Sequence, residues 1–182
     1  MVLTTAYFPS LRWIEAQREG ATIEAHENYQ KQSSRNRCRI MTAGGVQCLT
    51  VPVVHGAGRK VAIQDTRIDW VMPWQRTHAR AVMAAYRSAP YWEHFQDAIM
   101  PLFDLHETFL LDLNTRITTR LLEILKLNSS ISFTTKFEAV AQEPPPIISV
   151  PYYQVFADRY PFAENLSVVD AIFCEGRLPS EE

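Results

Sequence analysis

The sequence has little of what a disulfide-bonded or membrane-spanning protein needs. Its 182 residues include only three cysteines, which form no C-x-x-C pair, and this argues against a disulfide framework or a structural zinc site. No apolar run approaches the roughly 18 residues of a membrane-spanning helix, and the N-terminus lacks the basic region and apolar stretch of a signal peptide. We therefore expect a cytoplasmic protein with reduced thiols and no membrane span.

Charge of one sign is also scarce. The 18 basic and 20 acidic residues give a formal net charge of -2, far from the strongly basic balance of nucleic-acid-binding domains. We therefore expect no nucleic-acid partner. Fourteen of the basic residues are arginines. Because the arginine side chain contacts carboxylate and phosphate groups through a rigid fork, this bias suggests an anionic ligand.

The motifs of several large enzyme classes are absent. The sequence has no G-x-G-x-x-G fingerprint, no phosphate-binding P-loop, no G-x-S-x-G nucleophile motif and no H-E-x-x-H motif. His26 and Glu27 begin like the last of these, but Gln30 stands where the second histidine would be, which excludes that class of zinc peptidase. No histidine falls at ligand spacing with a second strong ligand, so the sequence indicates no metal site and identifies no cofactor.

What the sequence does contain predicts one folded domain. Its 47% apolar and 21% charged residues are typical of a globular chain. We find no internal repeat, and the one linker-like stretch is the proline run at 142–146, so we expect a single domain over residues 1–182. Strand-like segments precede helical ones. This order predicts an α+β fold, with a mixed or antiparallel sheet from the N-terminal half covered by helices from the C-terminal half.

The expected strands include a hairpin whose register can be read from its apolar residues. A two-residue turn at Gly44-Gly45 pairs Ile40 with Leu49 and Cys38 with Val51. Cys38 then lies on the apolar face as an inert buried thiol. Cys48 lies on the opposite face of the hairpin, which disfavours a disulfide between the two. The polar face carries a stripe of three arginines, Arg35, Arg37 and Arg39. Further strand-like segments span residues 3–6, 22–25, 62–69 and 131–134.

Helical patterns dominate after Pro73. They predict a helix that ends before Pro90, a shorter one around 92–100 and a final one over 167–173. Residues 104–107 resemble a capping box that opens a long helix with apolar residues every three or four positions through Ile124. Such a stripe suits either the core of the chain or the seam of a homodimer, and the sequence leaves both open.

The polar block at residues 24–37 is the candidate site. Lys31, Arg35 and Arg37 can bind an anion through charge-assisted hydrogen bonds, and Tyr29 can offer a flat apolar platform. The alternative is a solvated sheet face whose charges balance each other, since mixtures of arginine and glutamate are ordinary on protein surfaces. Asn36 falls on the apolar face, where it is either a structural clamp or part of a pocket floor.

Two histidines are candidates for proton transfer. His26 lies beside Glu27 and near the cations, which favours it as the acid or base if the polar block is catalytic. His78 is a lone histidine on the apolar face of the helix that begins at Pro73, so it is either a hydrogen-bonded core residue or a general base.

Sequence blocks along almost the whole chain resemble the WbqC-like proteins of bacteria. The polar block matches the pattern E-x-x-E-x-Y-x-K-x-x-x-R-N-R-C of one branch of that family. Another branch has asparagine in place of Cys38, which argues against a cysteine nucleophile. Residues 160–162 depart from the family, because Tyr-Pro-Phe replaces the usual His-Gly-Phe. The matching blocks are 6–9, 23–32, 35–40, 49–53, 73–76 with His78, 85–91, 112–114, 152–156, and 165–167 with Asp170 and 175–176.

The resemblance implies a role in assembling a bacterial surface polysaccharide, notably the O-antigen of lipopolysaccharide. It suggests acyl or aminoacyl transfer to an activated amino sugar, with a nucleotide-linked or phosphate-bearing sugar as partner. The alternative is a non-catalytic protein that binds an anion or glycan precursor. The catalytic candidates are His26, Glu27 and His78, and the substrate-binding candidates are Tyr7, Lys31, Arg35, Asn36 and Arg37.

Overall fold

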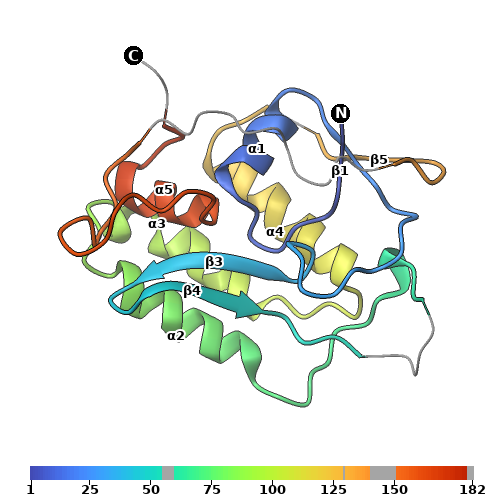
Figure 1. The fold of residues 1–182 in the computed structure, drawn as a ribbon, viewed down its shortest axis with the longest axis horizontal. Helices are drawn as coiled ribbons and strands as arrows, with labels where there is room; N and C mark the ends of the chain where they lie inside the picture. Colours follow the sequence, from blue (N-terminus) through green and yellow to red (C-terminus); the bar gives the residue numbers. More distant parts are fainter. Residues whose placement is uncertain (55–59, 129, 140–150, 180–182) are drawn as a thin grey trace.

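The computed structural model describes residues 1–54, 60–128, 130–139 and 151–179 (Figure 1). The helices are α1 (Leu11–Arg18), α2 (Trp74–Tyr86), α3 (Trp92–Ile99), α4 (Leu110–Ile124) and α5 (Val168–Glu175). The strands are β1 (Val2–Leu3), β2 (Thr22–Ile23), β3 (Arg37–Thr42), β4 (Gly45–Thr50) and β5 (Ser132–Phe133). The α+β class, with strands mainly in the N-terminal half and helices mainly in the C-terminal half, is therefore confirmed.

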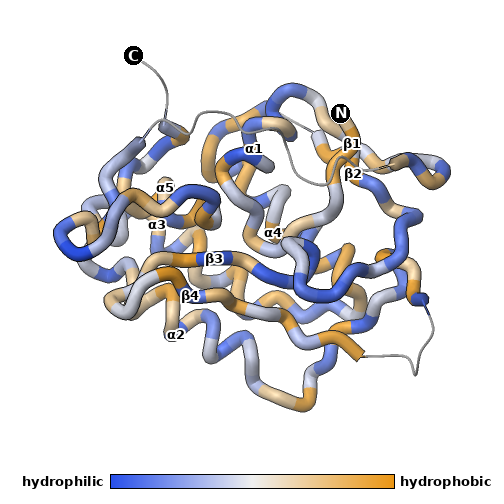
Figure 2. The backbone as a smooth tube through the Cα atoms, in the orientation of Figure 1, coloured by the Kyte–Doolittle hydropathy of each residue, from blue (hydrophilic) through white to orange (hydrophobic). Residues whose placement is uncertain are grey.

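The strands divide between two small sheets. β1, β2 and β5 form a parallel sheet, and β3 pairs with β4 in an antiparallel hairpin. The hairpin packs through β3 against α2 and α5 (Figure 1). The largely hydrophilic stretch between β2 and β3 runs along the outside before it enters the hairpin (Figure 2). The N-terminal segment meets the polar block just before β3, where the Tyr7 amide donates to the Ser34 carbonyl oxygen, and the residue before α5 meets β3 farther along, where the Ser167 amide donates to the Arg39 carbonyl oxygen.

The hairpin has the expected faces but not the expected register. Cys38 is buried and Cys48 is exposed, and both are free thiols. The structure pairs Cys38 with Leu49, so the turn lies at Ala43-Gly44, one residue earlier than the sequence suggested. The Thr42 hydroxyl donates to the Gly45 carbonyl oxygen over 2.8 Å and fixes the earlier turn. Because the pairing shifts by two residues, every side chain keeps its predicted face.

Several predicted elements begin elsewhere or do not form. The capping box at 104–107 is wrong: Asp104 ends a short 3-10 segment, and α4 begins at Leu110 without a side-chain cap. Glu107 instead forms an ion pair with Arg116. Residues 62–69 contain a 3-10 turn and isolated bridges rather than a regular strand. The proline run at 142–146 lies outside the described residues.

The apolar stripe of α4 belongs to the core of the chain. Leu113, Ile117 and Leu121 are at most 1% exposed. The stripe that suited either a core or a homodimer seam is thus used within the chain. Within the described ranges, no helix is both long and apolar enough to cross a membrane.

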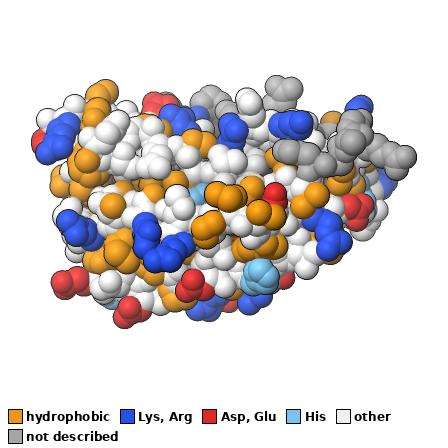
Figure 3. All heavy atoms as spheres, turned by 90° about the horizontal axis from the view of Figure 1, so that it is seen from below, with side chains coloured by type: hydrophobic (Ala, Val, Ile, Leu, Met, Phe, Trp, Pro, Cys, Tyr) orange, Lys and Arg blue, Asp and Glu red, His pale blue; other side chains and the backbone are white. Residues whose placement is uncertain are grey.

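α2 has the predicted extent and buries Trp74, His78 and Val82 along one face. Figure 3 shows that hydrophobic side chains also gather at the surface when the molecule is viewed from below. The exposed apolar residues of this segment are Val71 and Met72, which precede the helix, and Met83 within it. α2 therefore buries one stripe and leaves apolar residues exposed at its start and on its outer side.

α5 is tied to the rest of the fold through a buried carboxylate. The hydroxyls of Tyr86 and Tyr152 each donate to Asp170 over 2.7 Å, and the Met41 amide donates to the Tyr86 hydroxyl oxygen. Burial raises the pKa of Asp170 in spite of these hydrogen bonds. The network joins α2, β3, α5 and the segment that precedes α5.

Replacing Gly176 with alanine should destabilise the protein more than the same change at Gly20. Both glycines have positive φ, +72° and +87°, so each alanine pays for a left-handed backbone, about 1–2 kcal/mol. A Cβ on Gly176 would also lie 2.7 Å from the Tyr91 ring, whereas nothing lies within 4 Å at Gly20. We expect urea unfolding to show an additional loss of about 1–3 kcal/mol for Gly176→Ala. Equal losses would contradict the contact with Tyr91.

Candidate functional site

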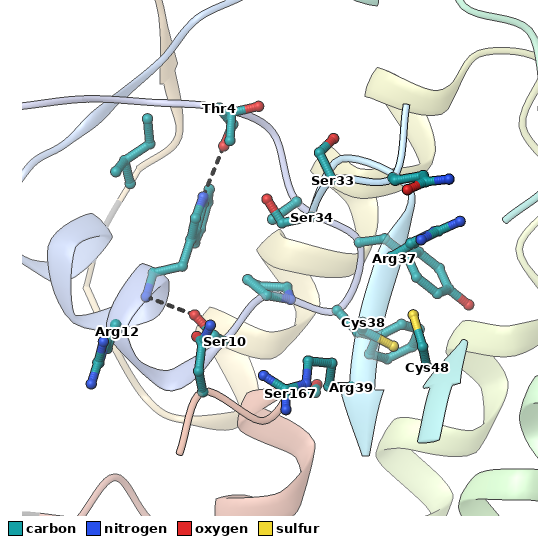
Figure 4. Close-up of a pocket in the computed structure, with 18 residues that line it drawn as sticks. Thr4, Ser10, Arg12, Ser33, Ser34, Arg37, Cys38, Arg39, Cys48 and Ser167 are labelled. Atoms are coloured by element: carbon teal, nitrogen blue, oxygen red, sulfur yellow. Dashed lines mark hydrogen bonds between the residues drawn. The ribbon is translucent and has the colours of Figure 1, made fainter. Parts of the chain in front are cut away.

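A cavity of about 300 Å³ opens beside β3, where the start of α1 meets the start of α5 (Figure 4). Three arginines line it, Arg12, Arg37 and Arg39. Four serines add hydroxyl groups, Ser10, Ser33, Ser34 and Ser167. The described residues that line the cavity include no aspartate or glutamate. This composition favours an anionic ligand, because arginine and hydroxyl groups donate to phosphate or carboxylate oxygens.

Hydrogen bonds between distant segments hold the wall of this cavity together. The Ser10 hydroxyl caps α1 by accepting from the Trp13 amide, and the Trp13 ring nitrogen donates to the Thr4 carbonyl oxygen over 2.8 Å (Figure 4). The Ser167 amide donates to the Arg39 carbonyl oxygen, also over 2.8 Å. Residues 4–13, β3 and the start of α5 are therefore fixed relative to one another around the cavity.

The cavity wall also contains unusual backbone. Phe8, Gln32 and Asn165 all line it, and all have positive φ, between 41° and 58°. The left-handed region costs a non-glycine residue about 1–2 kcal/mol, so it persists only where the surroundings hold it. Such strain is concentrated at functional sites more often than elsewhere.

A second hollow of about 220 Å³ adjoins the first. Tyr29, Lys31 and Asn36 line it, and Gln32 and Arg37 line both hollows. Drug-sized ligands occupy sites of about 300–1,000 Å³, so the larger hollow is at the lower limit of this range and the second hollow is below it. Together the two hollows suit a ligand with two parts.

Arg37 is the residue that connects the two hollows. Its side chain is half-buried, and its Nε atom is buried with no hydrogen-bond partner among the described residues. Burial raises the pKa of Tyr29, and the positive charge of Arg37 partly opposes this shift. An unpartnered buried N–H is costly, so a movement of the Arg37 side chain that lets this group donate to an anionic ligand would be favourable.

Tyr7 and His78 form a buried pair beneath the hollows. The Tyr7 hydroxyl and His78 Nδ1 are 2.9 Å apart, and the residues are 1% and 4% exposed. The other ring nitrogen of His78 bonds to the backbone of Thr50. Because the Thr50 carbonyl can only accept, His78 donates there from Nε2 and accepts from the Tyr7 hydroxyl at Nδ1. Burial lowers the pKa of His78 to about 4, so the ring is neutral at pH 7.

Through hydrogen bonds, this pair connects a residue that lines one hollow with a residue that lines the other. Tyr7 lines the larger hollow and Thr50 lines the smaller one, with His78 between them. Burial raises the pKa of Tyr7 well above its ordinary value, so its hydroxyl remains protonated. The Tyr7 oxygen can still accept a hydrogen bond while it donates to His78.

Glu27 and Arg35 pair with each other inside the protein. Arg35 donates from Nε to Glu27 Oε1 over 2.8 Å and from Nη2 to Oε2, and the two residues are 5% and 4% exposed. The Thr4 hydroxyl also donates to Glu27 Oε1, and the Asn114 amide donates to the Arg35 carbonyl oxygen. Neither charged residue lines either hollow. The predicted arginine stripe is therefore divided, with Arg35 buried in an ion pair, Arg37 half-buried and Arg39 exposed.

The remaining candidates are distributed unevenly. His26 is exposed, its Nε2 lies 3.0 Å from the Thr134 carbonyl oxygen, and it lines neither hollow. Lys31 is exposed at the second hollow. Asn36 is buried there and donates to the Val51 carbonyl oxygen over 2.8 Å. The structure thus gathers Tyr7, Lys31, Asn36 and Arg37 around the hollows with His78 behind them, and places His26, Glu27 and Arg35 elsewhere.

Sequence reasoning missed the residues that α1 and α5 bring to the cavity. Arg12 and Ser10 were overlooked because α1 was not predicted, although Ser10 is a recognisable helix cap before residues 11–18. Cys38 and Cys48 also line the cavity, but burial raises the pKa of Cys38, which keeps that thiol protonated. In the described part of the chain, no three histidine, cysteine, aspartate or glutamate side chains gather so as to hold a metal ion.

Comparisons with known proteins give a family for this chain. The model of the WbqC-like protein family matches residues 6–150. Uncharacterized protein Rv1507c of Mycobacterium tuberculosis (strain ATCC 25618 / H37Rv) is 30% identical over 111 residues, which cover 60% of this chain and 48% of the relative. The chain therefore spans about half the length of that relative. No solved structure matches the chain significantly. Since the family model covers most of the chain, and the polar block and both hollows lie largely within it, the chain belongs to the WbqC-like protein family.

Proposed function

We propose that this protein binds a phosphate-bearing sugar, such as a nucleotide-linked amino sugar, and transfers an acyl or aminoacyl group to the sugar amine. The reaction would serve assembly of a bacterial surface polysaccharide, such as O-antigen, in the cytoplasm. The family supports the polysaccharide context. The cavity lined by three arginines and four serines supports the anionic ligand.

The observation that carries the proposal is the position of Arg37 between the two hollows. Because Arg37 lines both hollows, its guanidinium group can contact a ligand that extends from one hollow into the other. In the proposal, Arg37 binds the phosphate, and the sugar lies where the two hollows meet, between Tyr7 of the larger hollow and Tyr29, Lys31 and Asn36 of the smaller one. Arg35 has a supporting role, because its guanidinium is already bonded to Glu27.

Proton transfer in the proposed reaction runs through Tyr7 to His78. The sugar amine attacks the carbonyl carbon of an activated donor, such as a thioester, so that a C–N bond forms and the C–S bond breaks. The amine proton passes to the Tyr7 oxygen while the Tyr7 proton passes to His78 Nδ1, and the thiolate that leaves takes a proton back by the same route. The 2.9 Å contact between Tyr7 and His78 supports this assignment over one to His26.

A non-catalytic binding protein is the second candidate. The observation that favours it is the near-complete burial of Tyr7 and His78, which is also expected for two structural residues that satisfy each other's hydrogen bonds. Such a protein would use the same arginines to hold a glycan precursor without changing it.

Arg37→Ala should weaken binding of a nucleotide-linked amino sugar by about 10- to 100-fold, because a charge-assisted hydrogen bond is lost. The probe is UDP-glucosamine, which has a free amine, and the measurement is isothermal titration calorimetry. Arg37→Lys should also weaken binding, because an ammonium group cannot reproduce the forked contact. Arg120→Ala is the matched control, since this side chain is 56% exposed on α4. Unchanged affinity in Arg37→Ala would contradict the proposal.

A further inference from the structure

The end of the larger hollow that lies away from Arg37 has no role in the proposed function so far. Ser10 and Arg12 approach it from the start of α1, Ser167 from the start of α5, and Arg39 from β3 (Figure 4). These residues come from three separate parts of the chain, and none belongs to the candidates identified from the sequence. We call these four residues the α1 end of the cavity.

Arg12 is the central cation of the α1 end. Its side chain is 16% exposed, and its Nε is buried without a hydrogen-bond partner in the described part of the chain. Its Nη2 lies 3.2 Å from Glu164 Oε2, but the Glu164 side chain is 65% exposed. An exposed ion pair of this kind contributes little, so a ligand anion can compete for Arg12.

The backbone at the helix starts also adds a smaller positive potential at the α1 end. α1 begins at this end, and its first turn contains no acidic residue to offset the positive end of the helix dipole. The first amides of α5 are already bonded, Val168 to the Pro9 carbonyl oxygen, Val169 to the Ser167 hydroxyl and Asp170 to the Ser167 carbonyl oxygen. The start of α5 therefore contributes its dipole and a hydroxyl group, but no free amide.

Two cationic groups thus lie at different ends of one cavity, with Arg37 beside Ser33 and Ser34 at one end and Arg12 with Arg39 at the other. A single phosphate that links a sugar to a nucleoside carries one negative charge and would leave the α1 end unmatched. A diphosphate carries a negative charge on each phosphate, which matches the presence of arginines at both ends.

We propose that the ligand is a nucleoside-diphosphate sugar, whose two phosphates lie at the Arg37 end and at the α1 end of the cavity. This inference rests on the proposed function and narrows its substrate class. Arg37 and the nearby serines hold the phosphate next to the sugar. Arg12 and Arg39 hold the second phosphate, which bears the nucleoside.

Two probes with the same sugar separate the two ends. UDP-glucosamine carries a diphosphate, and glucosamine 1-phosphate carries only the phosphate next to the sugar. The measurement is isothermal titration calorimetry. We expect Arg12→Gln and Arg39→Gln each to lower the affinity for UDP-glucosamine by about 10-fold or more, and the affinity for glucosamine 1-phosphate by less than about twofold. Arg37→Ala should lower the affinity for both probes. Glu164→Gln should raise the affinity for UDP-glucosamine by about two- to threefold, because it removes the carboxylate that pairs with Arg12.

The outcomes distinguish this inference from the proposed function. The diphosphate assignment is overturned if Arg12→Gln and Arg39→Gln leave the affinity for UDP-glucosamine unchanged, or if they lower the affinity for both probes equally. In either case, the proposal that the protein binds a phosphate-bearing sugar still stands. If neither probe binds the unaltered protein, both proposals are overturned. Arg120→Gln serves as the control for a general loss of positive charge, and melting temperatures show whether each variant is folded.

Discussion

Arg35→Ala is expected to lower the free energy of unfolding by about 3–5 kcal/mol, because it leaves the Glu27 carboxylate buried without its cation. Two hydrogen bonds from Arg35 and one from Thr4 hold Glu27 in a site that is 4% exposed. The unpaired charge must either be solvated by local opening or take up a proton. Urea unfolding monitored by circular dichroism measures the loss.

A matched control separates burial from charge. Arg116→Ala removes a guanidinium from an ion pair with Glu107, but that side chain is 58% exposed, so we expect a change of at most about 1 kcal/mol. The double variant Glu27→Gln, Arg35→Met removes both buried charges and should be more stable than Arg35→Ala. A loss below about 1 kcal/mol in Arg35→Ala would contradict the structural role and return Arg35 to the ligand-binding candidates.

Tyr7→Phe is expected to lower turnover by about 100-fold or more while changing ligand affinity by no more than a few-fold. The ring still fills its place against Phe8 and Trp74, but the hydroxyl that bonds to His78 is lost. The stability cost of this one hydrogen bond is about 1–3 kcal/mol, because His78 Nδ1 is left unsatisfied. The measurement is mass-based detection of the acylated UDP-glucosamine, together with calorimetry on the same preparation.

Tyr153→Phe is the control, since it removes a hydroxyl from a residue that is 52% exposed and lines neither hollow. If Tyr7→Phe turns over at the rate of the unaltered protein, the proton route through His78 is wrong. If the unaltered protein binds the probe but forms no acylated product with any activated donor, the binding-protein alternative replaces the enzyme.

The elements that could be predicted are those whose signal is local. The hairpin faces follow from alternation between Cys38 and Val53, and α5 follows from the Ser167 cap before an apolar run. The one-residue error in the turn arose because the Thr42 hydroxyl stabilises an earlier turn than the glycines alone suggest. α1 was missed because eight residues show little periodicity, and only the cap at Ser10 marks its start.

The site divides in the same way. Lys31, Asn36 and Arg37 lie on one continuous stretch and were identified from it. Arg12 and Ser167 reach the cavity only because α1 and α5 meet, which no local pattern reports. Whether the mixed charges of the polar block are solvated or paired inside the protein depends on burial. Glu27 and Arg35 are paired and buried, whereas Lys31 is exposed.

The most direct test of the central claim, that the arginine-lined cavity is the site of a phosphate-bearing sugar, is a crystal structure of the protein with UDP-glucosamine. We expect density for the two phosphates within hydrogen-bond distance of Arg37 and Arg12, with the amino sugar extending toward Tyr29. Density for the ligand in the groove between α3 and α4, lined by Asp97 and Arg120, or phosphates beyond the reach of Arg37, would contradict it.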